Sequence, residues 1–328
     1  MCAVVGITAC APRAPHAGAV VPHGRDAASY LLIQEPDSTF EPILGVIKSA
    51  TKSIRMEMYE LVSPAAIRAL VDTHKRGVAT KVLLDAAYHG RAANQRAFNT
   101  LQAAGVDARW APDNVIFHEK AIIADDATVA VGTGNLSGRR FEATSRDFWV
   151  LDTSPADVAA ISETFDQDFG GGSADRAAAG VLAPGLIWSP DSRRSFLTVI
   201  AATRRTLSIT SEEFTDTAIS SAVAGAAGRG VKCRVILNDD AGTTSAVDEV
   251  RAAGCAVRLV PASEHGLFMH AKVILADDQL VVGSQNLAPK SLLDNRELSL
   301  LLDTRTAPDV VPAVQHTFDT DFAAASAG

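Results

Sequence analysis

The sequence has neither a long apolar run nor a dense run of basic residues. A transmembrane helix needs about 20 consecutive, mostly apolar residues, and no segment of the chain reaches that length. The formal net charge is −8, so bulk electrostatics would not draw the chain onto nucleic acid or an anionic membrane. With 47% apolar and 21% charged residues, the composition is typical of a soluble globular protein.

Cysteine is also scarce. The chain has four cysteines, and no cysteine–histidine cluster has the spacing of a zinc site, so we expect no metal. Cys233 and Cys255 fall on two predicted strands and could form a disulfide if those strands are neighbours. Free cysteine is commonly buried as a small apolar residue, and we therefore expect two buried thiols here.

The first 24 residues differ from the rest of the chain. Residues 1–10 are apolar and uncharged, and residues 11–24 are rich in Pro, Ala, Gly and His. Ile7-Thr8-Ala9-Cys10 resembles the lipobox of bacterial lipoproteins, although a basic segment before it is missing and the apolar segment is short. A start codon placed too far downstream would explain both departures, and a disordered tail is the alternative. We predict a secreted or cell-envelope lipoprotein, and otherwise a cytoplasmic protein.

Short segments recur through the chain at a separation of about 150 residues. Ala103-Ala104-Gly105 returns as Ala252-Ala253-Gly254, and a Thr-Phe-Asp-x-Asp-Phe segment ends at Phe169 and again at Phe322. Agreement across whole halves indicates a tandem duplication. We predict a tail or remnant signal over 1–24, a first domain over 25–170, a linker over 171–185 and a second domain over 186–328.

Helical and strand patterns alternate within each half. The first half predicts a helix over 37–50, strands over 54–59 and 81–84, helices over 64–74 and 92–104, a strand over 106–110, a hairpin over 118–131, a strand over 148–151 and a helix over 155–169. The second half repeats this order. Strand–helix alternation followed by a hairpin predicts the α/β class, with a mixed, mostly parallel sheet flanked by helices in each half.

One stretch with chemical potential occurs in both halves. His118 and Lys120 stand two apart on an apolar strand and therefore point to one side of it, as do His270 and Lys272. Each stretch ends in a Gly-[Ser/Thr]-x-Asn segment, which supplies Thr133 and Asn135 in the first half and Ser284 and Asn286 in the second. Two such stretches could form one paired site.

This pattern resembles the phospholipase D superfamily, whose signature is H-x-K-x4-D-x6-G-[ST]-x-N. The first copy fits throughout, whereas the second has five residues instead of six between Asp277 and Gly283. The resemblance extends over nearly the whole chain from about residue 30. It implies two similar phospholipase D-like domains related by a pseudo-twofold axis, with one active site at their interface. A monomer would suffice for such a site.

The resemblance also implies a reaction: phosphodiester cleavage in two displacements, with a phosphohistidine intermediate and no cofactor. We assign His118 as the nucleophile and His270 as the acid and base, with the reverse assignment as the alternative. The phosphate would be held by two lysines and two amides, namely Lys120, Lys272, Asn135 and Asn286. Such donors can stabilise an anionic phosphate without a metal ion.

Several further residues are assigned around this site. By resemblance, Asp147 and Glu297 would hydrogen-bond the catalytic histidines, and a solvated strand-edge acid is the alternative. We expect four residues to contact substrate: Thr133, Ser284, Glu60 and Glu213. The last two end the first strands of their halves, where open α/β sheets place ligands. A turn-forming role is the alternative for the two hydroxyls. Asp125 and Asp277 lie in Asp-Asp turns and are expected to support the fold.

The substrate is open among phosphodiesters. We favour cleavage of a phospholipid headgroup ester to phosphatidic acid, with peripheral membrane contact. One alternative is a phospholipase D-type nuclease acting on DNA or RNA, for which the negative net charge is unfavourable. Another is a cardiolipin synthase-like phosphatidyltransferase. A phosphate-binding adaptor without activity would predict erosion of one motif, and both motifs keep His, Lys and Asn.

Overall fold

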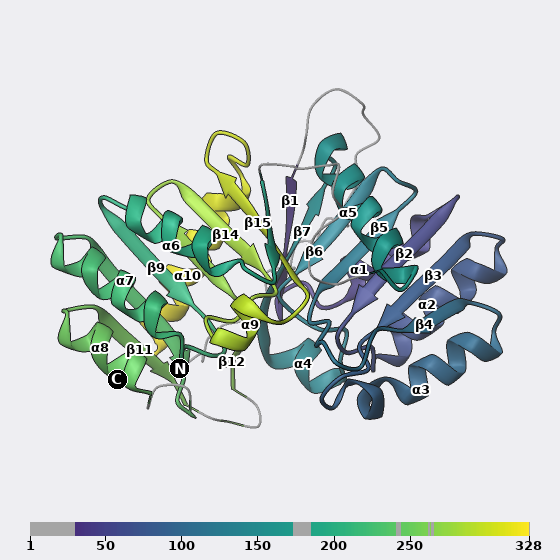
Figure 1. Cartoon of the computed structure of the whole chain (residues 1–328), viewed down its shortest axis with the longest axis horizontal. Coiled ribbons are helices and arrows are strands. Elements are labelled where there is room, and N and C mark those ends of the chain that lie inside the picture. Colours follow the sequence, from purple (N-terminus) through teal and green to yellow (C-terminus); the bar gives the residue numbers. More distant parts are fainter. Residues whose placement is uncertain (1–29, 173–184, 241–243, 262, 264–265, 328) are drawn as a thin grey trace, which may run out of the picture.

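The computed structural model describes residues 30–172, 185–240, 244–261, 263 and 266–327. It contains two sheets that stand next to each other at the centre of the molecule, with helices on their outer sides (Figure 1). The predicted tail over 1–24 and most of the predicted linker lie outside the described residues. Within the described residues, no helix is long and apolar enough to cross a membrane.

The first half contains seven strands and five helices among the described residues. In chain order they are β1 (Tyr30–Glu35), α1 (Glu41–Ser49), β2 (Ser53–Met58), α2 (Pro64–Lys75), β3 (Ala79–Leu84), α3 (Gly90–Ala103), β4 (Asp107–Trp110), β5 (Lys120–Ala124), β6 (Thr128–Gly132), α4 (Arg139–Thr144), β7 (Ser145–Asp152) and α5 (Pro155–Phe169). The sheet order is β1-β7-β6-β5-β2-β3-β4. All the elements predicted from the sequence are present, and β1 and α4 are additional.

The second half repeats this order with small changes. Its elements are β8 (Leu186–Ser189), α6 (Arg193–Ala202), β9 (Thr206–Thr210), α7 (Thr217–Gly228), β10 (Lys232–Asn238), α8 (Ser245–Ala252), β11 (Ala256–Val260), β12 (Phe268–Met269), β13 (Val273–Ala276), β14 (Gln279–Gly283), α9 (Pro289–Leu293), β15 (Glu297–Asp303), α10 (Val310–Ala324) and β16 (Ser326–Ala327). The sheet order is β16-β11-β10-β9-β13-β14-β15-β8.

The strand directions confirm a mixed α/β fold. In the first sheet, β2, β3 and β4 pair in parallel, while β5, β6, β7 and β1 follow in antiparallel pairs. As a result, β1, β2, β3, β4 and β6 all run in one direction, and β5 and β7 run in the other. The second sheet has the same arrangement from β9 to β15.

Local sequence explains where several helices begin. Ser63 and Ser154 each precede a proline, and each side chain accepts a hydrogen bond from a backbone N–H in the first turn of the helix that follows. A serine cap with proline at the first helical position is a common helix start. The equivalent helix of the second half, α7, is capped by Asp216.

Three apolar clusters form the core. One lies between the first sheet and helices α1–α3, and another between the second sheet and α6–α8. The third is shared by both halves and includes Phe148 and Phe165 from the first, and Leu300 and Phe318 from the second. Because this central cluster is continuous, the two halves form one packed unit.

The halves also exchange short backbone pairings. β12 of the second half pairs in parallel with β7 of the first, opposite Ser145 and Arg146. The reciprocal contact is a bridge between Phe117 and Arg296. In each case, the residue just before the histidine of one half pairs with the other half, at the start of β7 or at the residue before β15.

Two turns accommodate the different motif lengths. The hairpin β5–β6 pairs Ala124 with Thr128, and β13–β14 pairs Ala276 with Gln279. The second turn is therefore one residue shorter, and this accounts for the whole difference in motif length. Leu136 and Leu287, each directly after the motif asparagine, then make equivalent bridges to Leu61 and Phe214.

The prediction of two free thiols in the second half was wrong. Cys233 and Cys255 form a disulfide. They precede Arg234 and Ala256, which are opposite each other in the parallel pair β10–β11. Strand register, which the sequence did not reveal, brings the two side chains together.

Candidate active site

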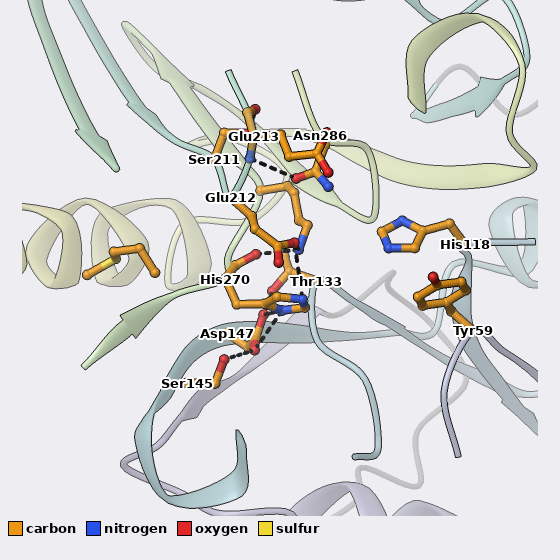
Figure 2. Close-up of polar contacts among 12 residues, drawn as sticks. Tyr59, His118, Thr133, Ser145, Asp147, Ser211, Glu212, Glu213, His270 and Asn286 are labelled. Atoms are coloured by element: carbon orange, nitrogen blue, oxygen red, sulfur yellow. Dashed lines mark hydrogen bonds and ion pairs between the residues drawn. The ribbon is translucent and has the colours of Figure 1, made fainter. Parts of the chain in front are cut away.

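The two histidines lie where the halves meet, each just before a central strand. His118 precedes β5 and His270 precedes β13. Both are buried, with 9% and 3% of their surfaces exposed. Figure 2 shows His118 with Tyr59 on one side of the site, and His270 with Glu212 on the other. The structure therefore brings the two predicted histidines into one site.

His118 is held by an acid of the other half. Its Nδ1 lies 2.9 Å from Oε2 of Glu297. The other oxygen of Glu297 accepts hydrogen bonds from Ser291 and from the Asn295 amide. An imidazole that donates through Nδ1 to a carboxylate presents Nε2 to the site. Burial, followed by the charge of Lys120, lowers the pKa of His118 to about 4, so the ring is neutral at pH 7.

His270 has the reciprocal arrangement. Its Nδ1 lies 2.9 Å and 3.1 Å from the two oxygens of Asp147 in the first half. Thr133 and Ser145 donate to the same carboxylate at 2.6 Å and 2.7 Å. Burial raises the pKa of Asp147, but His270 and Lys272 lower it more, so the net pKa is below its ordinary value. Asp147 is therefore an anion in the resting site.

The two lysines are almost completely buried. Lys120 and Lys272 have 0% and 3% of their surfaces exposed, and each ammonium group donates to the carbonyl of the histidine two residues earlier. Burial, followed by repulsion from Lys272, lowers the pKa of Lys120 to about 7. Two close cations with few partners form a favourable place for an anion.

The motif asparagines flank this region. Asn135 and Asn286 are 7% and 6% exposed. Oδ1 of Asn286 accepts from the backbone N–H of Glu213 at 3.4 Å, while Oδ1 of Asn135 has no partner among the described residues. The next residues, Leu136 and Leu287, make equivalent bridges, so the shorter second turn leaves Asn286 in a position equivalent to that of Asn135.

Two predicted substrate contacts, Thr133 and Ser284, stabilise the ends of strands in the structure. Both residues are fully buried, and their hydroxyls accept from the backbone N–H groups of Phe148 and Leu298. These bonds link the end of β6 to β7 and the end of β14 to β15. The hydroxyl of Thr133 also donates to Asp147. A contact of either hydroxyl with substrate stays a prediction.

The two predicted glutamates have different surroundings. The carboxylate of Glu60 lies 2.7 Å from Nε2 of His89 and accepts from Ser137 at 3.1 Å, so local contacts occupy it and a substrate contact is not supported. Glu213 lines a cavity of about 370 Å³ together with Glu212, Asp240 and the rings of Phe214 and Phe268. Repulsion from Glu212 adds to burial in raising the pKa of Glu213.

Asp125 and Asp277 lie at the far ends of the motif strands. Asp125 accepts from the backbone N–H groups of Thr51, Lys52 and Ser53. Asp277 accepts from those of Arg204, Arg205 and Thr206. Both residues have positive φ, 57° and 56°. They fix the entries into β2 and β9, which is a structural role.

Sequence reasoning missed Glu212. Its Oε2 lies 3.0 Å from Nζ of Lys272 and 3.4 Å from Nε2 of His270. Burial raises the pKa of Glu212, but Lys272 and His270 lower it more, so the net pKa is below its ordinary value. The repeat comparison had favoured its neighbour Glu213, because Glu213 matches Glu60 in residue type. The signal that could have indicated Glu212 was its position just after the end of β9, where ligand contacts are expected.

The geometry combines two imidazoles, two buried lysines and two amides around one space. Each base is oriented by an anion of the opposite half. Such a set can attack an electrophilic centre, protonate a leaving group and stabilise an anion. An anionic phosphodiester fits all three capabilities.

The comparisons with known proteins agree with this geometry. A family model described as "Cardiolipin synthase, PLD-like domain", where PLD denotes phospholipase D, matches twice, over residues 43–169 and 196–322. A mitochondrial cardiolipin hydrolase of Xenopus laevis is 27% identical over 131 residues, which are 40% of this chain and 61% of that protein. Its counterpart in Xenopus tropicalis is 32% identical over 133 residues, 40% of this chain and 60% of that protein.

A solved structure supports the fold over a longer span. The phosphatidylserine synthase of Haemophilus influenzae superimposes with a TM-score of 0.70 over 93% of this chain and 88% of that chain, at 12% sequence identity. At that identity the likeness is one of fold. Together with two family matches that cover most of the chain, it shows that the chain belongs to the phospholipase D superfamily, whose members cleave or transfer phosphodiesters.

Proposed function

We propose that this protein is a metal-independent phosphodiesterase that cleaves a phospholipid headgroup ester to phosphatidic acid through a phosphohistidine intermediate. The observation that carries the proposal is the reciprocal pairing of His118 with Glu297 and of His270 with Asp147. It leaves the Nε2 atoms of two imidazoles for chemistry at one phosphate, with buried lysines beside them.

In the first displacement, Nε2 of neutral His118 attacks phosphorus. The bond from phosphorus to the headgroup oxygen breaks, and that oxygen takes a proton from Nε2 of His270. Lys120, Lys272 and the amides of Asn135 and Asn286 donate to the non-bridging oxygens. The developing charge is stabilised by groups already in place, which is the main source of catalysis in phosphoryl transfer.

In the second displacement, His270 is neutral and acts as a base. It takes a proton from water, the water oxygen attacks phosphorus, and the bond to Nε2 of His118 breaks. His118 returns as a neutral imidazole and His270 as an imidazolium. Glu297 and Asp147 stabilise the positive charge that each ring carries in turn.

Two observations support a lipid over a nucleic acid. The matched relatives are named cardiolipin hydrolases, and three acidic residues, Glu212, Glu213 and Asp240, line the described cavity. A polyanionic strand would be repelled there, whereas a single diester between two lysines would not. Peripheral contact with a membrane follows from a lipid substrate.

A transferase is the second candidate. The description of the matching family model names cardiolipin synthase. In a transferase, an alcohol would replace water in the second displacement.

We also propose an exported or cell-envelope location. The disulfide Cys233–Cys255 supports it, because disulfides persist mainly in oxidising compartments.

The test is turnover of four diesters in parallel: phosphatidylcholine, cardiolipin, single-stranded DNA and bis(p-nitrophenyl) phosphate. Each is assayed with and without glycerol, which reveals transfer. Wild type is compared with His118→Asn, His270→Asn and the matched control His316→Asn, whose side chain is exposed on α10. We expect lipid turnover that is lost in the first two variants and retained in the third.

The outcomes separate the candidates. Products joined to glycerol would favour the transferase, and turnover of DNA alone would favour the nuclease. Full activity of both His118→Asn and His270→Asn would refute the mechanism for any substrate. Circular dichroism of each variant shows whether the fold is retained.

A further inference from the structure

The two halves of the active site differ at one pair of equivalent positions. The carbonyls of Ser53 and Thr206 accept from Asp125 and Asp277 in the same way, and Leu61 and Phe214 make the same bridge. Tyr59 and Glu212 stand at the same place between these landmarks. A tyrosine therefore lies beside the first histidine, and a glutamate beside the second (Figure 2).

Glu212 makes two contacts with the second motif through one oxygen. Oε2 lies 3.0 Å from Nζ of Lys272 and 3.4 Å from Nε2 of His270. The side chain is 30% exposed at the mouth of the site. Because 3.4 Å is long for a hydrogen bond, the contact between Glu212 and His270 is mainly electrostatic.

Tyr59 makes an apolar contact with the first motif. Its ring packs edge-on against His118 with 4.6 Å between the ring centres. The ammonium group of Lys120 lies 5.1 Å from the centre of the same ring. Among the described residues, the only ion pair of His118 is with Glu297 at Nδ1.

The charges around the two rings are consequently unequal. His270 is faced by Asp147 from β7, by Glu212 from the end of β9 and by Lys272. His118 is faced by Glu297 from β15 and by two lysines, which with burial disfavour its charged form. Glu212 acts on His118 more weakly than on His270. Below pH 7, where Lys120 is charged, the two lysines balance Asp147 and Glu297. Glu212 is then one further negative charge, which a proton on His270 would balance.

We propose that Glu212 is the positioning residue that makes the paired site directional: it keeps the proton on His270, and so fixes His270 as the acid and His118 as the nucleophile. This inference rests on the proposed two-displacement function and adds a residue that acts through His270. The cost is weaker binding of the anionic substrate, because the carboxylate lies beside Lys272.

The test uses two lipids with the same retained part and different leaving groups. Dihexanoylphosphatidylcholine releases an alcohol that needs a proton, whereas dihexanoylphosphatidyl-p-nitrophenol releases a phenolate that does not. Wild type is compared with Glu212→Gln, Glu212→Ala and the matched control Glu249→Gln, whose carboxylate binds Ser220 and Ser221 far from the histidines. Thermal melting confirms that each variant is folded.

Loss of the proton on His270 should slow cleavage of the choline ester more than cleavage of the p-nitrophenyl ester. For Glu212→Gln, we expect kcat/KM for the choline ester to fall about tenfold more than for the p-nitrophenyl ester, a part of the 10²–10⁴ that general acid catalysis supplies. His270→Asn should show a larger loss of the same kind, and Glu249→Gln none. Alkaline quenching and peptide mass spectrometry should find the phosphatidyl group on His118.

Two results would overturn the inference. One is an equal loss on both esters in Glu212→Gln and Glu212→Ala, which is what a merely structural role predicts. The other is a phosphatidyl group on His270 in wild type. If wild type turned over neither ester, the proposed function itself would fail, so the two failures are distinguishable.

Discussion

Oε2 of Glu297 lies 2.9 Å from Nδ1 of His118, although the two residues are 179 positions apart in the chain. Asp147 and His270 have the reciprocal relationship across 123 positions. Each half therefore provides a histidine for the site and orients the histidine of the other half. Neither half contains a complete base with its acid.

The orienting acids should matter more for turnover than for binding. We expect Asp147→Asn and Glu297→Gln each to lower kcat by about 10²-fold or more, because an amide can hold the wrong tautomer and cannot stabilise an imidazolium. Steady-state kinetics on the preferred diester measures this. Asp319→Asn, an exposed carboxylate on α10, is the control. A tenfold rise in KM with unchanged kcat would contradict the assigned role.

The pH profile should be shifted towards acid. His118, with a pKa of about 4, is a neutral nucleophile above that pH. Lys120, with a pKa of about 7, loses its charge as the pH rises through 7. We therefore expect kcat/KM, which reports the free enzyme, to be greatest between about pH 4 and 7.

A p-nitrophenyl diester is the suitable substrate for this profile, since its leaving group needs no proton. In Lys120→Arg the cation persists at high pH, so the decline above pH 7 should move to higher pH, whatever the loss in rate. A decline that stays at pH 7 in this variant would exclude Lys120 as its cause.

The buried pair Arg296–Asp168 should contribute strongly to stability. Both side chains are 0% exposed, with Nε of Arg296 2.8 Å from the carboxylate of Asp168. Arg296→Leu leaves Asp168 without its partner and should cost roughly 3–5 kcal/mol of unfolding free energy. Urea unfolding at pH 7 measures this change.

The control for that prediction is Arg305→Leu, which removes an ion pair whose arginine is 86% exposed. Exposed pairs contribute little, so this variant should unfold close to wild type. Equal midpoints for Arg296→Leu and wild type would show that the buried pair is not needed.

The disulfide should stabilise the second half without affecting chemistry. It closes a separation of 22 residues, and the serine double variant at Cys233 and Cys255 should lose about 3 kcal/mol. Turnover per folded molecule should be unchanged. The cysteines lie at the starts of β10 and β11, at the end of the sheet away from the histidines. Thiol titration of the oxidised protein that detects both residues as free would contradict the assignment.

Much of the fold was predictable from the sequence, because the repeats fix two copies of one element order and the patterns of His118–Lys120 and His270–Lys272 fix the same strand in each copy. The reciprocal acids were predicted from resemblance only. Which half each acid serves depends on tertiary pairing, here the exchange of β12 onto β7. Local patterns contain no information on that pairing.

Other contacts were not visible in the sequence for similar reasons. Thr133 belongs to the motif, and only the tertiary structure shows that its hydroxyl donates to Asp147. Glu212 was overlooked because its repeat partner is Tyr59, and a search for matching residues discards mismatches. In a duplicated site, a mismatch at equivalent positions is a place where the two halves can differ in function.

The reciprocal acids have a consequence for ancestry. A single half could complete its site only by pairing with a second copy, and both copies would then carry the same residue at the position of Tyr59 and Glu212. Fusion into one chain removes that restriction, since each copy can mutate alone. The covalent link between the halves thus allows the two positions to differ, so that one histidine can be specialised for attack and the other for proton transfer.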